Sequence, residues 1–585
     1  MCGIITIKGN HFDDAIIDKM LMTLRHRGPD EQKFSKIGDT ILGQARLAIV
    51  DLSAGNQPMR DNTKPITIVF NGEIYDYKTQ KVELEKKGHK FKTQSDTEVI
   101  LKAYIEYGTK CLDYIDGMFA FAIWDEEKNQ MFIARDRFGK KPFYYSFIDG
   151  AFIGASEIKA IFASNKIKGK IDPQALYDYL HYGYIGPDKT IYSNISTLLP
   201  GHALLLKDDK LEIWKYWDIK KVENRDSYDQ AKIQIEKLFA EASRKRMVAD
   251  VEIGSLLSGG VDSTLTTLYA QKYSSFPIKT FSVGYEGNKN ELPFAIEASK
   301  RIGTDHYSLP INSDLTQSLL DIISYMDEPH GDNSNFPQHL ISKLASSKVK
   351  VALTGDGADE LFMGYGWYQK KMHIPRWRLD LIFKDAFAIQ QKMITMFDDK
   401  EINKLVKSGV NKNENYLKAI LRDVKDPIDK INIFDLKFYL PGQLLSKIDR
   451  TSMMNSLEVR SPFLDTRLAE YVYNLPSSYK FSKHQNKIIL KDILADTFPH
   501  DFVYRRKQGF GAPIKDWLKQ DKMRQLIKAN LLDKQAFISN YLNQDYIAKI
   551  MADFDSGKRN SEYKLWVLLC LGIWFGRHKD NIENV

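Results

Sequence analysis

The chain has 585 residues, of which 43% are hydrophobic and 27% charged, so we expect two large domains or three to four smaller ones. Its net charge of +8 comes from interspersed basic and acidic residues, and this pattern argues against a nucleic-acid-binding face. The three cysteines, Cys2, Cys111 and Cys570, fit neither a disulfide framework nor a structural zinc site, and they indicate a reducing, cytoplasmic setting. We find no signal peptide, and the longest apolar stretch, residues 565–575, is too short to span a bilayer and fits a buried helix.

The pattern of predicted elements changes near residue 207. Before it, short alternating strands at residues 67–70, 118–124, 131–135 and 143–146 and a helix at 97–107 indicate stacked β-sheets with covering helices. Residues 207–229 predict a final strand pair followed by a linker. After it, a helix at 228–245 and strands at 251–257, 279–283 and 349–354 alternate with helices, which predicts a parallel sheet covered on both faces. Beyond about residue 367 the chain is mostly helical.

Cys2 is the first catalytic candidate, because it follows the initiator methionine directly. Removal of Met1 would leave a thiol beside an α-amine, whose ordinary pKa of about 7.7–8.0 suits a general base. The alternative is a small buried residue, which most free cysteines are. Position alone leaves the two interpretations balanced.

A glycine-rich run, residues 258–263 (SGGVDS), lies between a predicted buried strand and a predicted helix. Its glycines allow backbone N–H groups to face an anion, and the helix N-terminus adds positive charge. Asp262 would repel a bare phosphate, so its presence implies a bridging Mg²⁺. An ordinary glycine turn is the alternative, but the full run in this context favours phosphate binding. The run lacks the lysine of a Walker A motif, which disfavours γ-phosphoryl transfer.

A second glycine-containing turn, residues 354–360 (TGDGADE), also follows an apolar strand. Its acids are Asp356, Asp359 and Glu360, which could be no more than a solvated loop. At the carboxyl end of a parallel strand, however, the turn would lie where open α/β sheets bind ligands. We therefore expect these acids to bridge a metal and orient a substrate.

The ordered motifs resemble one family. Four runs resemble class II, N-terminal-nucleophile glutamine amidotransferases: residues 2–4 (CGI), 26–30 (HRGPD), 71–75 (NGEIY) and 135–142 (RDRFGKKP). The two glycine-containing turns and residues 455–465 (NSLEVRSPFLD) resemble the synthetase domain of glutamine-hydrolysing asparagine synthetases. The resemblance implies an N-terminal αββα sandwich of mainly antiparallel sheets over residues 2–205 and a linker over 206–228. A doubly wound, parallel-sheet ATP-pyrophosphatase domain with a helical extension would follow over 229–585.

The resemblance also implies the roles of residues in the first domain. Cys2 would attack the side-chain amide of glutamine, and the Asn71 side chain and the Gly72 N–H would stabilise the oxyanion. Arg46 would hold the α-carboxylate of glutamine, while Glu73 and Asp96 would hold its α-ammonium. Considered without the family, Arg46 is a surface arginine and Asp96 a helix N-cap.

In the second domain the resemblance implies activation of aspartate by ATP as an acyl-adenylate, which ammonia then converts to asparagine. Pyrophosphate would contact Ser258, Gly260, Asp262 and Ser263, and Mg²⁺ would bridge Asp262 and Asp359. Adenosine would contact a set of four residues: Leu257, Val283, Thr354 and Gly355. Lys487 would offset charge on the adenylate, although alone it is one solvated lysine among many. Asp356 would help to form the adenylate, and ammonia would cross between the sites inside the protein.

Three positions depart from the family pattern. Residues 327–329 (DEP) and Asp332-x-Ser334 keep the family spacing, but Gly331 stands where alanine is more usual. Gln44 stands where we expect histidine, which implies a local change beside the glutamine pocket. Asp356 stands where the family often has glutamate, and its shorter side chain affects the reach to the acceptor. Family members also amidate sugar acids and cell-wall precursors, so another carboxylate is the alternative acceptor. The resemblance further implies a homodimer, and it assigns no role to residues 363–434. The charge pattern and the short apolar stretches lead us to expect no nucleic-acid or membrane partner.

Overall fold

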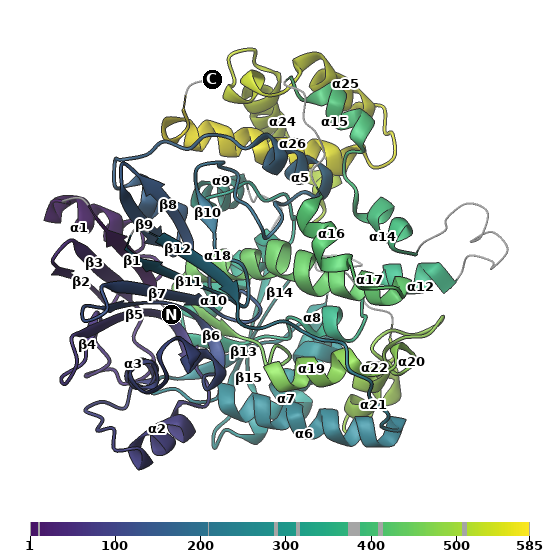
Figure 1. Ribbon diagram of the computed structural model, residues 1–585. Coiled ribbons are helices and arrows are strands. Elements are labelled where there is room, and N and C mark those ends of the chain that lie inside the picture. Colours follow the sequence, from purple (N-terminus) through teal and green to yellow (C-terminus); the bar gives the residue numbers. More distant parts are fainter. Residues whose placement is uncertain are drawn as a thin grey trace.

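The computed structural model describes residues 2–9, 12–208, 210–285, 291–311, 316–372, 386–407, 414–505 and 512–583. Figure 1 shows a β-sandwich on one side, a parallel sheet beside it, and a mostly helical remainder around and above the parallel sheet. Part of the 363–434 stretch and the basic residues Arg506 and Lys507 lie outside the described residues.

The sandwich consists of two antiparallel sheets. Within the described residues the first has the order β10-β8-β9-β1-β3-β2 and the second has the order β12-β11-β7-β6-β5-β4. The strands of the first sheet are β1 Gly3–Lys8, β2 Glu31–Ile37, β3 Thr40–Arg46, β8 Tyr144–Ile148, β9 Ala151–Ala155 and β10 Ser196–Thr197. Those of the second are β4 Met59–Arg60, β5 Ile66–Ile74, β6 Gly117–Asp125, β7 Gln130–Arg135, β11 His202–Lys207 and β12 Lys210–Lys215.

Helices cover both outer faces of the sandwich. α1 Asp14–Met22, α4 Ile158–Phe162 and α5 Pro173–Tyr182 share a core with the first sheet, whereas α2 Tyr77–Lys86 and α3 Asp96–Tyr107 cover the second. Side chains such as Ile4, Val69 and Phe143 fill the space between the sheets. This arrangement confirms the predicted αββα sandwich. The first part of the predicted linker is strand β12, which pairs with β11 in the second sheet.

The parallel sheet has the order β15-β14-β13-β16-β17 in the described part of the chain. Its strands are β13 Ile253–Leu256, β14 Lys279–Tyr285, β15 Asp305–Ile311, β16 Val351–Leu353 and β17 Glu458–Arg460. One face packs on α6 Tyr228–Arg246, α7 Val261–Lys272, α8 Leu292–Ile302, α19 Thr466–Asn474 and α21 Ile488–Ala495. The other face packs on α10 Asn335–Ser346 and α18 Ser446–Met453. The chain progresses outward from β13 in both directions, which confirms the doubly wound prediction.

The helical extension surrounds this sheet. It comprises α9 Thr316–Tyr325, α11 Ala358–Leu361, α12 Gly366–Met372, α14 Ala386–Ile394, α15 Asp399–Leu405, α16 Asn415–Leu421, α17 Pro427–Phe434, a π-helix over Asp435–Leu445, α20 Ser477–Lys480, α22 His500–Val503, α23 Ile514–Trp517, α24 Asp521–Ile527, α25 Gln544–Asp555 and α26 Ser561–His578. Short 3₁₀ or π turns occur at Gly108–Asp113, Lys528–Leu532, Phe537–Asn540 and Lys579–Asn581.

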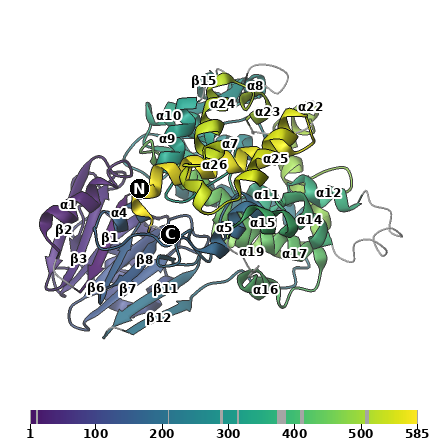
Figure 2. The same cartoon turned by 90° about the horizontal axis from the view of Figure 1, so that it is seen from above.

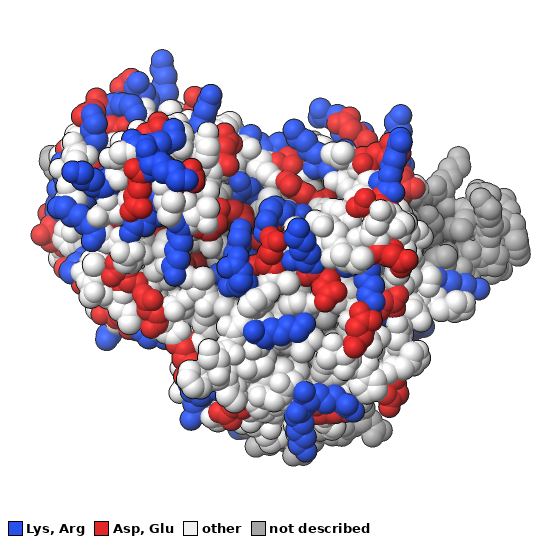
Figure 3. Space-filling model, turned by 90° about the horizontal axis from the view of Figure 1, so that it is seen from below, with Lys and Arg blue, Asp and Glu red and all other residues white. Residues whose placement is uncertain are grey.

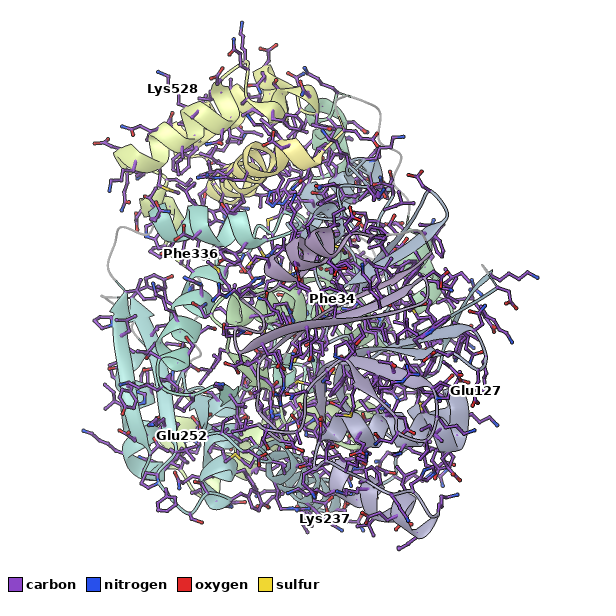
Figure 4. All side chains as sticks on the ribbon, turned by 90° about the vertical axis from the view of Figure 1, so that its left-hand side faces the viewer. Phe34, Glu127, Lys237, Glu252, Phe336 and Lys528 are labelled. Atoms are coloured by element: carbon purple, nitrogen blue, oxygen red, sulfur yellow. The ribbon has the colours of Figure 1, made fainter. Side chains whose placement is uncertain are left out.

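The last long helix, α26, joins the extension to the sandwich. Its Val567 carbonyl accepts a hydrogen bond of 2.8 Å from the Tyr179 hydroxyl of α5, and Figure 2 shows these two helices beside each other. In Figure 4 Glu127 of the sandwich and Glu252 of the parallel-sheet half lie on opposite sides, with Lys528 of the extension above them. The two halves therefore form one continuous body.

No described helix is both long and apolar enough to cross a membrane. On the face shown in Figure 3, basic and acidic side chains are interspersed.

Candidate functional sites

Cys2 lies at the start of β1, beside the middle of β5. Its backbone nitrogen donates to Asn71 Oδ1 at 3.0 Å, and its side chain is 7% exposed. Burial raises the pKa of the Cys2 thiol, so the sulfur needs a nearby base to become a nucleophile. Cys2 is a buried residue that lies against Asn71, the proposed oxyanion donor, and its role as a nucleophile stays a prediction.

Asn71 and Gly72 present donors beside the thiol. Asn71 Nδ2 is buried without a hydrogen-bond partner, although the oxygen of the same amide is bonded. Gly72 has φ 156°, and a Cβ there would lie 2.0 Å from the Met118 carbonyl oxygen of the paired strand. Only glycine fits this position, and an unpartnered buried donor fits an oxyanion that forms during the reaction.

Two buried carboxylates follow the donors. Asp96 Oδ2 accepts from the Ile74 N–H at 3.0 Å, and burial raises the pKa of Asp96 to about 6. Glu73 Oε2 accepts from Arg460, whereas Glu73 Oε1 is buried without a partner and is available to an ammonium group. The cap of α3 is Ser95, whose side chain accepts from the Thr97 N–H, so the alternative that Asp96 is the N-cap is wrong.

Arg46 is 7% exposed, so the alternative that it is a surface arginine is also wrong. Its guanidinium donates to the Asp51 and Leu52 carbonyls and to Asn56 Oδ1 at 2.8–3.2 Å. These bonds fix its position at the end of β3. Nearby Gln44, which replaces the expected histidine, donates to the Phe70 carbonyl at 2.9 Å and thus supports the strand that carries Asn71.

The second half of the chain contributes side chains to this first site. Arg460, at the end of β17, is fully buried and donates to Glu73 Oε2 at 3.0 Å and Glu458 Oε1 at 2.6 Å. Arg27 is also fully buried, and its Nε donates to the Cys2 carbonyl at 3.1 Å while its Nη atoms bind Asp449 of α18. Both arginines lie in runs that the sequence singled out, but the sequence assigned them no role.

The two glycine-containing turns meet at the switch point of the parallel sheet. β13 and β16 are paired neighbours, and the chain leaves both in the same direction. A Cβ on Gly355 would lie 2.8 Å from Asp262 Cβ and 3.0 Å from the Ser263 nitrogen, so glycine lets the turns touch. Within the first turn, Ser263 Oγ accepts from the Ser258 N–H at 3.2 Å, and Gly260 is the N-cap of α7. The predicted phosphate-binding residues therefore lie together.

Lys487 links the two turns. Its ammonium lies 2.5 Å from Asp262 Oδ2 and 2.7 Å from Asp359 Oδ1, and it is 5% exposed, so the solvated-lysine alternative is wrong. Its backbone has φ 56°, an unfavourable conformation for a non-glycine residue that often accompanies function. Gly364 permits the contact, since a Cβ there would lie 2.0 Å from Asp359 Oδ1 and 2.1 Å from Lys487 Cε. The sequence did not identify Gly364.

The remaining predicted residues surround these turns. Asp356 Oδ2 accepts from the Thr354 hydroxyl at 2.5 Å, and burial raises the pKa of Asp356. Glu360, which follows Asp359, is fully buried, and burial raises its pKa to about 7. Leu257 and Val283 are buried on neighbouring strands, and the Leu257 N–H donates to the Phe281 carbonyl at 2.8 Å. These positions provide an apolar wall beside the phosphate turn.

A cavity of about 50 Å³ lies between the two halves. Tyr144 and Thr197 of the sandwich line it, as do Glu328, His330 and Leu445 of the second half. Its volume accommodates molecules the size of water or ammonia. Beside it Arg450 binds Glu157 and Asp327, each at 3.1 Å, in a buried ionic cluster that crosses between the halves.

Comparison with known proteins agrees with this two-part organisation. The glutamine amidotransferase domain family matches residues 1–217, and the asparagine synthase family matches residues 234–576, more than half of the chain. Asparagine synthetase [glutamine-hydrolyzing] 3 of Bacillus subtilis is 33% identical over 86% of this chain and 86% of its own length. Asparagine synthetase [glutamine-hydrolyzing] 1 of the same organism is 30% identical over 100% of this chain and 97% of its own.

Among solved structures, glutamine phosphoribosylpyrophosphate amidotransferase from B. subtilis is 16% identical with a TM-score of 0.28. That match covers 52% of this chain and 65% of the other, so the chain spans less than two thirds of its length. The family models and the curated relatives cover nearly the whole chain with both domains in order. The chain therefore belongs to the asparagine synthase family and carries an N-terminal glutamine amidotransferase domain.

Proposed function

We propose that this enzyme hydrolyses glutamine at Cys2 and uses the ammonia to convert aspartate to asparagine at the expense of ATP. The observation that carries the proposal is the meeting of the two turns at the switch point, where Lys487 contacts both Asp262 and Asp359. Family membership supports the same chemistry, since both matched domains are those of glutamine-dependent amidation.

At the first site the α-amine of a mature Cys2 takes the thiol proton, and the sulfur attacks the amide carbon of glutamine. Asn71 Nδ2 and the Gly72 N–H stabilise the oxyanion. The α-ammonium then returns its proton to the amide nitrogen, the C–N bond breaks, and ammonia leaves. The remaining thioester is hydrolysed by water to glutamate. The unpartnered Asn71 Nδ2 and Glu73 Oε1 support these assignments, because each offers the group that the substrate needs. Arg46 and Asp96 complete the binding of the α-carboxylate and α-ammonium.

At the second site a carboxylate oxygen of aspartate attacks the α-phosphorus of ATP, and the bond to pyrophosphate breaks. Ser258, Gly260 and Ser263 hold the pyrophosphate, Lys487 offsets its charge, and Leu257, Val283, Thr354 and Gly355 contact adenosine. Asp356 orients the acceptor. Ammonia then attacks the acyl carbon, its C–N bond replaces the bond to AMP, and a proton is lost.

Asp262 and Asp359 fit a magnesium site. Asp262 Oδ1 is buried without a partner, and Mg²⁺ is usually held by one or two carboxylates together with phosphate oxygens. The described residues contain no group of three or more metal-binding side chains, which agrees with a site that the nucleotide completes. Bound there, Mg²⁺ would neutralise phosphate charge.

Ammonia must reach the second site without becoming ammonium. The cavity between the halves supports an internal path, because Asp449, which lines it, binds the arginine that contacts Cys2, and His330 of the second half lines it too. We place the enzyme in the cytoplasm, since its three cysteines are buried and free. The homodimer remains a prediction, which sedimentation equilibrium tests.

Carboxylate-dependent ATP–pyrophosphate exchange tests the proposal. Aspartate should support exchange, whereas exchange with another acid and none with aspartate would refute the asparagine assignment. Cys2→Ala should abolish glutaminase activity and keep amidation from ammonium salt, because the second site does not need the thiol. Loss of both activities in a folded variant would contradict the two-site scheme.

A further inference from the structure

A buried polar cluster lies where the loop before α10 meets the π-helix and α18. Its members are His330, Asp332, Ser334, Asn335, Gln443 and Lys447, and we call it the His330–Lys447 cluster. The steps proposed above for adenylation and glutamine hydrolysis use none of these residues.

The cluster contains one charge of each sign. Lys447 Nζ lies 3.2 Å from Asp332 Oδ2 and 2.8 Å from Ser334 Oγ, and the two charged side chains are 9% and 15% exposed. Burial alone would raise the pKa of Asp332, but the nearby Lys447 ammonium helps to lower it to about 2, so the Asp332 carboxyl is ionised at neutral pH. Because desolvation offsets most of the attraction in a buried ion pair, stability is a weak explanation for this one.

The cluster also contains hydrogen-bond acceptors that are not used. Gln443 Nε2 donates to Asp332 Oδ2 at 2.8 Å, and Asn335 Nδ2 bonds His330 Nδ1 at 3.2 Å. The oxygens of both amides, however, are buried without partners. Burial lowers the pKa of His330 to about 4, so this ring is neutral and adds no second cation. Unpartnered buried acceptors beside a carboxylate suit an ammonium group.

The cluster lies between the cavity and the adenylation turn. His330 lines the cavity through which we propose that ammonia arrives. On the other side, the charge of Lys447 acts on Asp356, and the Asp356 carbonyl accepts from the Ser461 hydroxyl at 2.5 Å. Lys447 is therefore close enough to Asp356 for their charges to interact, which links the cluster to the adenylation turn.

We propose that the His330–Lys447 cluster binds the two charged groups of an α-amino acid acceptor. Lys447 binds the α-carboxylate, while Asp332, Gln443 Oε1 and Asn335 Oδ1 bind the α-ammonium. This inference rests on the proposed function and deepens it, since it selects an amino acid over a sugar acid, which lacks the ammonium. When the amino acid binds, the ion pair between Asp332 and Lys447 is replaced by two others. Lys447 pairs with the α-carboxylate, and Asp332 pairs with the α-ammonium.

The test measures ATP–pyrophosphate exchange with aspartate, with succinate and β-alanine as competing acids. Succinate lacks the α-ammonium, and β-alanine lacks the α-carboxylate. Asp332→Asn should lower kcat/KM for aspartate by at least about tenfold and change the inhibition constant of succinate less than about threefold. Lys447→Met should lower kcat/KM for aspartate similarly and leave inhibition by β-alanine nearly unchanged.

Two further variants separate binding from folding. Lys447→Arg keeps the charge and should retain more activity than Lys447→Met at an equal melting temperature. Gln443→Leu removes the unpartnered oxygen without removing a charge. It should raise the KM for aspartate more than it raises the KM for ATP.

Three outcomes would overturn the inference. If folded variants of Asp332 and Lys447 weaken the binding of aspartate, succinate and β-alanine to the same extent, the cluster does not distinguish the α-ammonium from the α-carboxylate. If galacturonate supports exchange and aspartate does not, the zwitterion site is wrong, although the ligase chemistry stands. If no acid supports exchange, the proposed function itself fails.

Discussion

Gly364 offers a test of the proposed ATP site that changes no charge. A Cβ at this position would lie 2.0 Å from Asp359 Oδ1 and 2.1 Å from Lys487 Cε, whereas ordinary contacts begin near 3.4 Å. In Gly364→Ala the side chains of Asp359 and Lys487 must therefore move away from the new methyl group by about 1.4 Å. A displacement of about 1 Å in a catalytic group costs on the order of 100-fold in rate. We expect a loss of that size in aspartate-dependent ATP–pyrophosphate exchange.

The chain provides a matched control two residues away. A Cβ on Gly366 meets nothing within 4 Å, so Gly366→Ala should exchange at the wild-type rate. Glutaminase activity should be equal in both variants, because the nearest neighbours of a Cβ at Gly364 are Asp359 and Lys487, which belong to the second site. The reasoning would be refuted if Gly364→Ala exchanged within about threefold of wild type, or if Gly366→Ala lost as much as Gly364→Ala.

Two other predictions concern the glutaminase site. Asp96, with a pKa of about 6, is ionised only above that pH, so the KM for glutamine should rise as pH falls below about 6. Asp96→Asn should give a raised KM with no pH dependence there, and an unchanged profile would argue that another group titrates. Arg460→Lys should raise the KM for glutamine about tenfold, because one ammonium cannot hold Glu73 and Glu458 as a guanidinium does. If Arg460→Lys lowers ATP–pyrophosphate exchange as much as it lowers glutaminase activity, the substitution acts on the structure in general and not on the glutamine pocket.

The fold and the membership of each site were largely predictable because they depend on local order along the chain. Residues 258–263 and 354–360 each follow a buried strand, and parallel strands end at one edge of a sheet. That rule predicts that the two turns lie at one edge, whereas the pairing of Asp262 with Asp359 came from the family resemblance; in the structure Lys487 contacts both. Strand pairing across the boundary was less clear, since β12 is short and polar and resembles a linker.

Contacts between distant segments were not predictable. Arg460 and Glu73 are 387 positions apart, and no periodicity or turn rule relates them. Gly364 looks like any loop glycine until the positions of Asp359 and Lys487 are known. Asp332 and Ser334 keep the family spacing, but nothing in the sequence relates them to Lys447, and only the packing of α18 against the loop before α10 brings these residues together.

The structure also gives a physical reason for the presence of both reactions in one chain. On α18, Lys447 faces the His330–Lys447 cluster, and two residues later Asp449 binds the arginine that contacts the Cys2 carbonyl. On β17, the Arg460 side chain binds Glu73 while its carbonyl accepts from the Thr354 N–H at 2.9 Å. Each element therefore contributes to both sites, and close-packed elements move as units. The proposed glutamine pocket depends on both domains, because burial raises the pKa of Glu73 and Arg460 of the second half is the cation that opposes this rise.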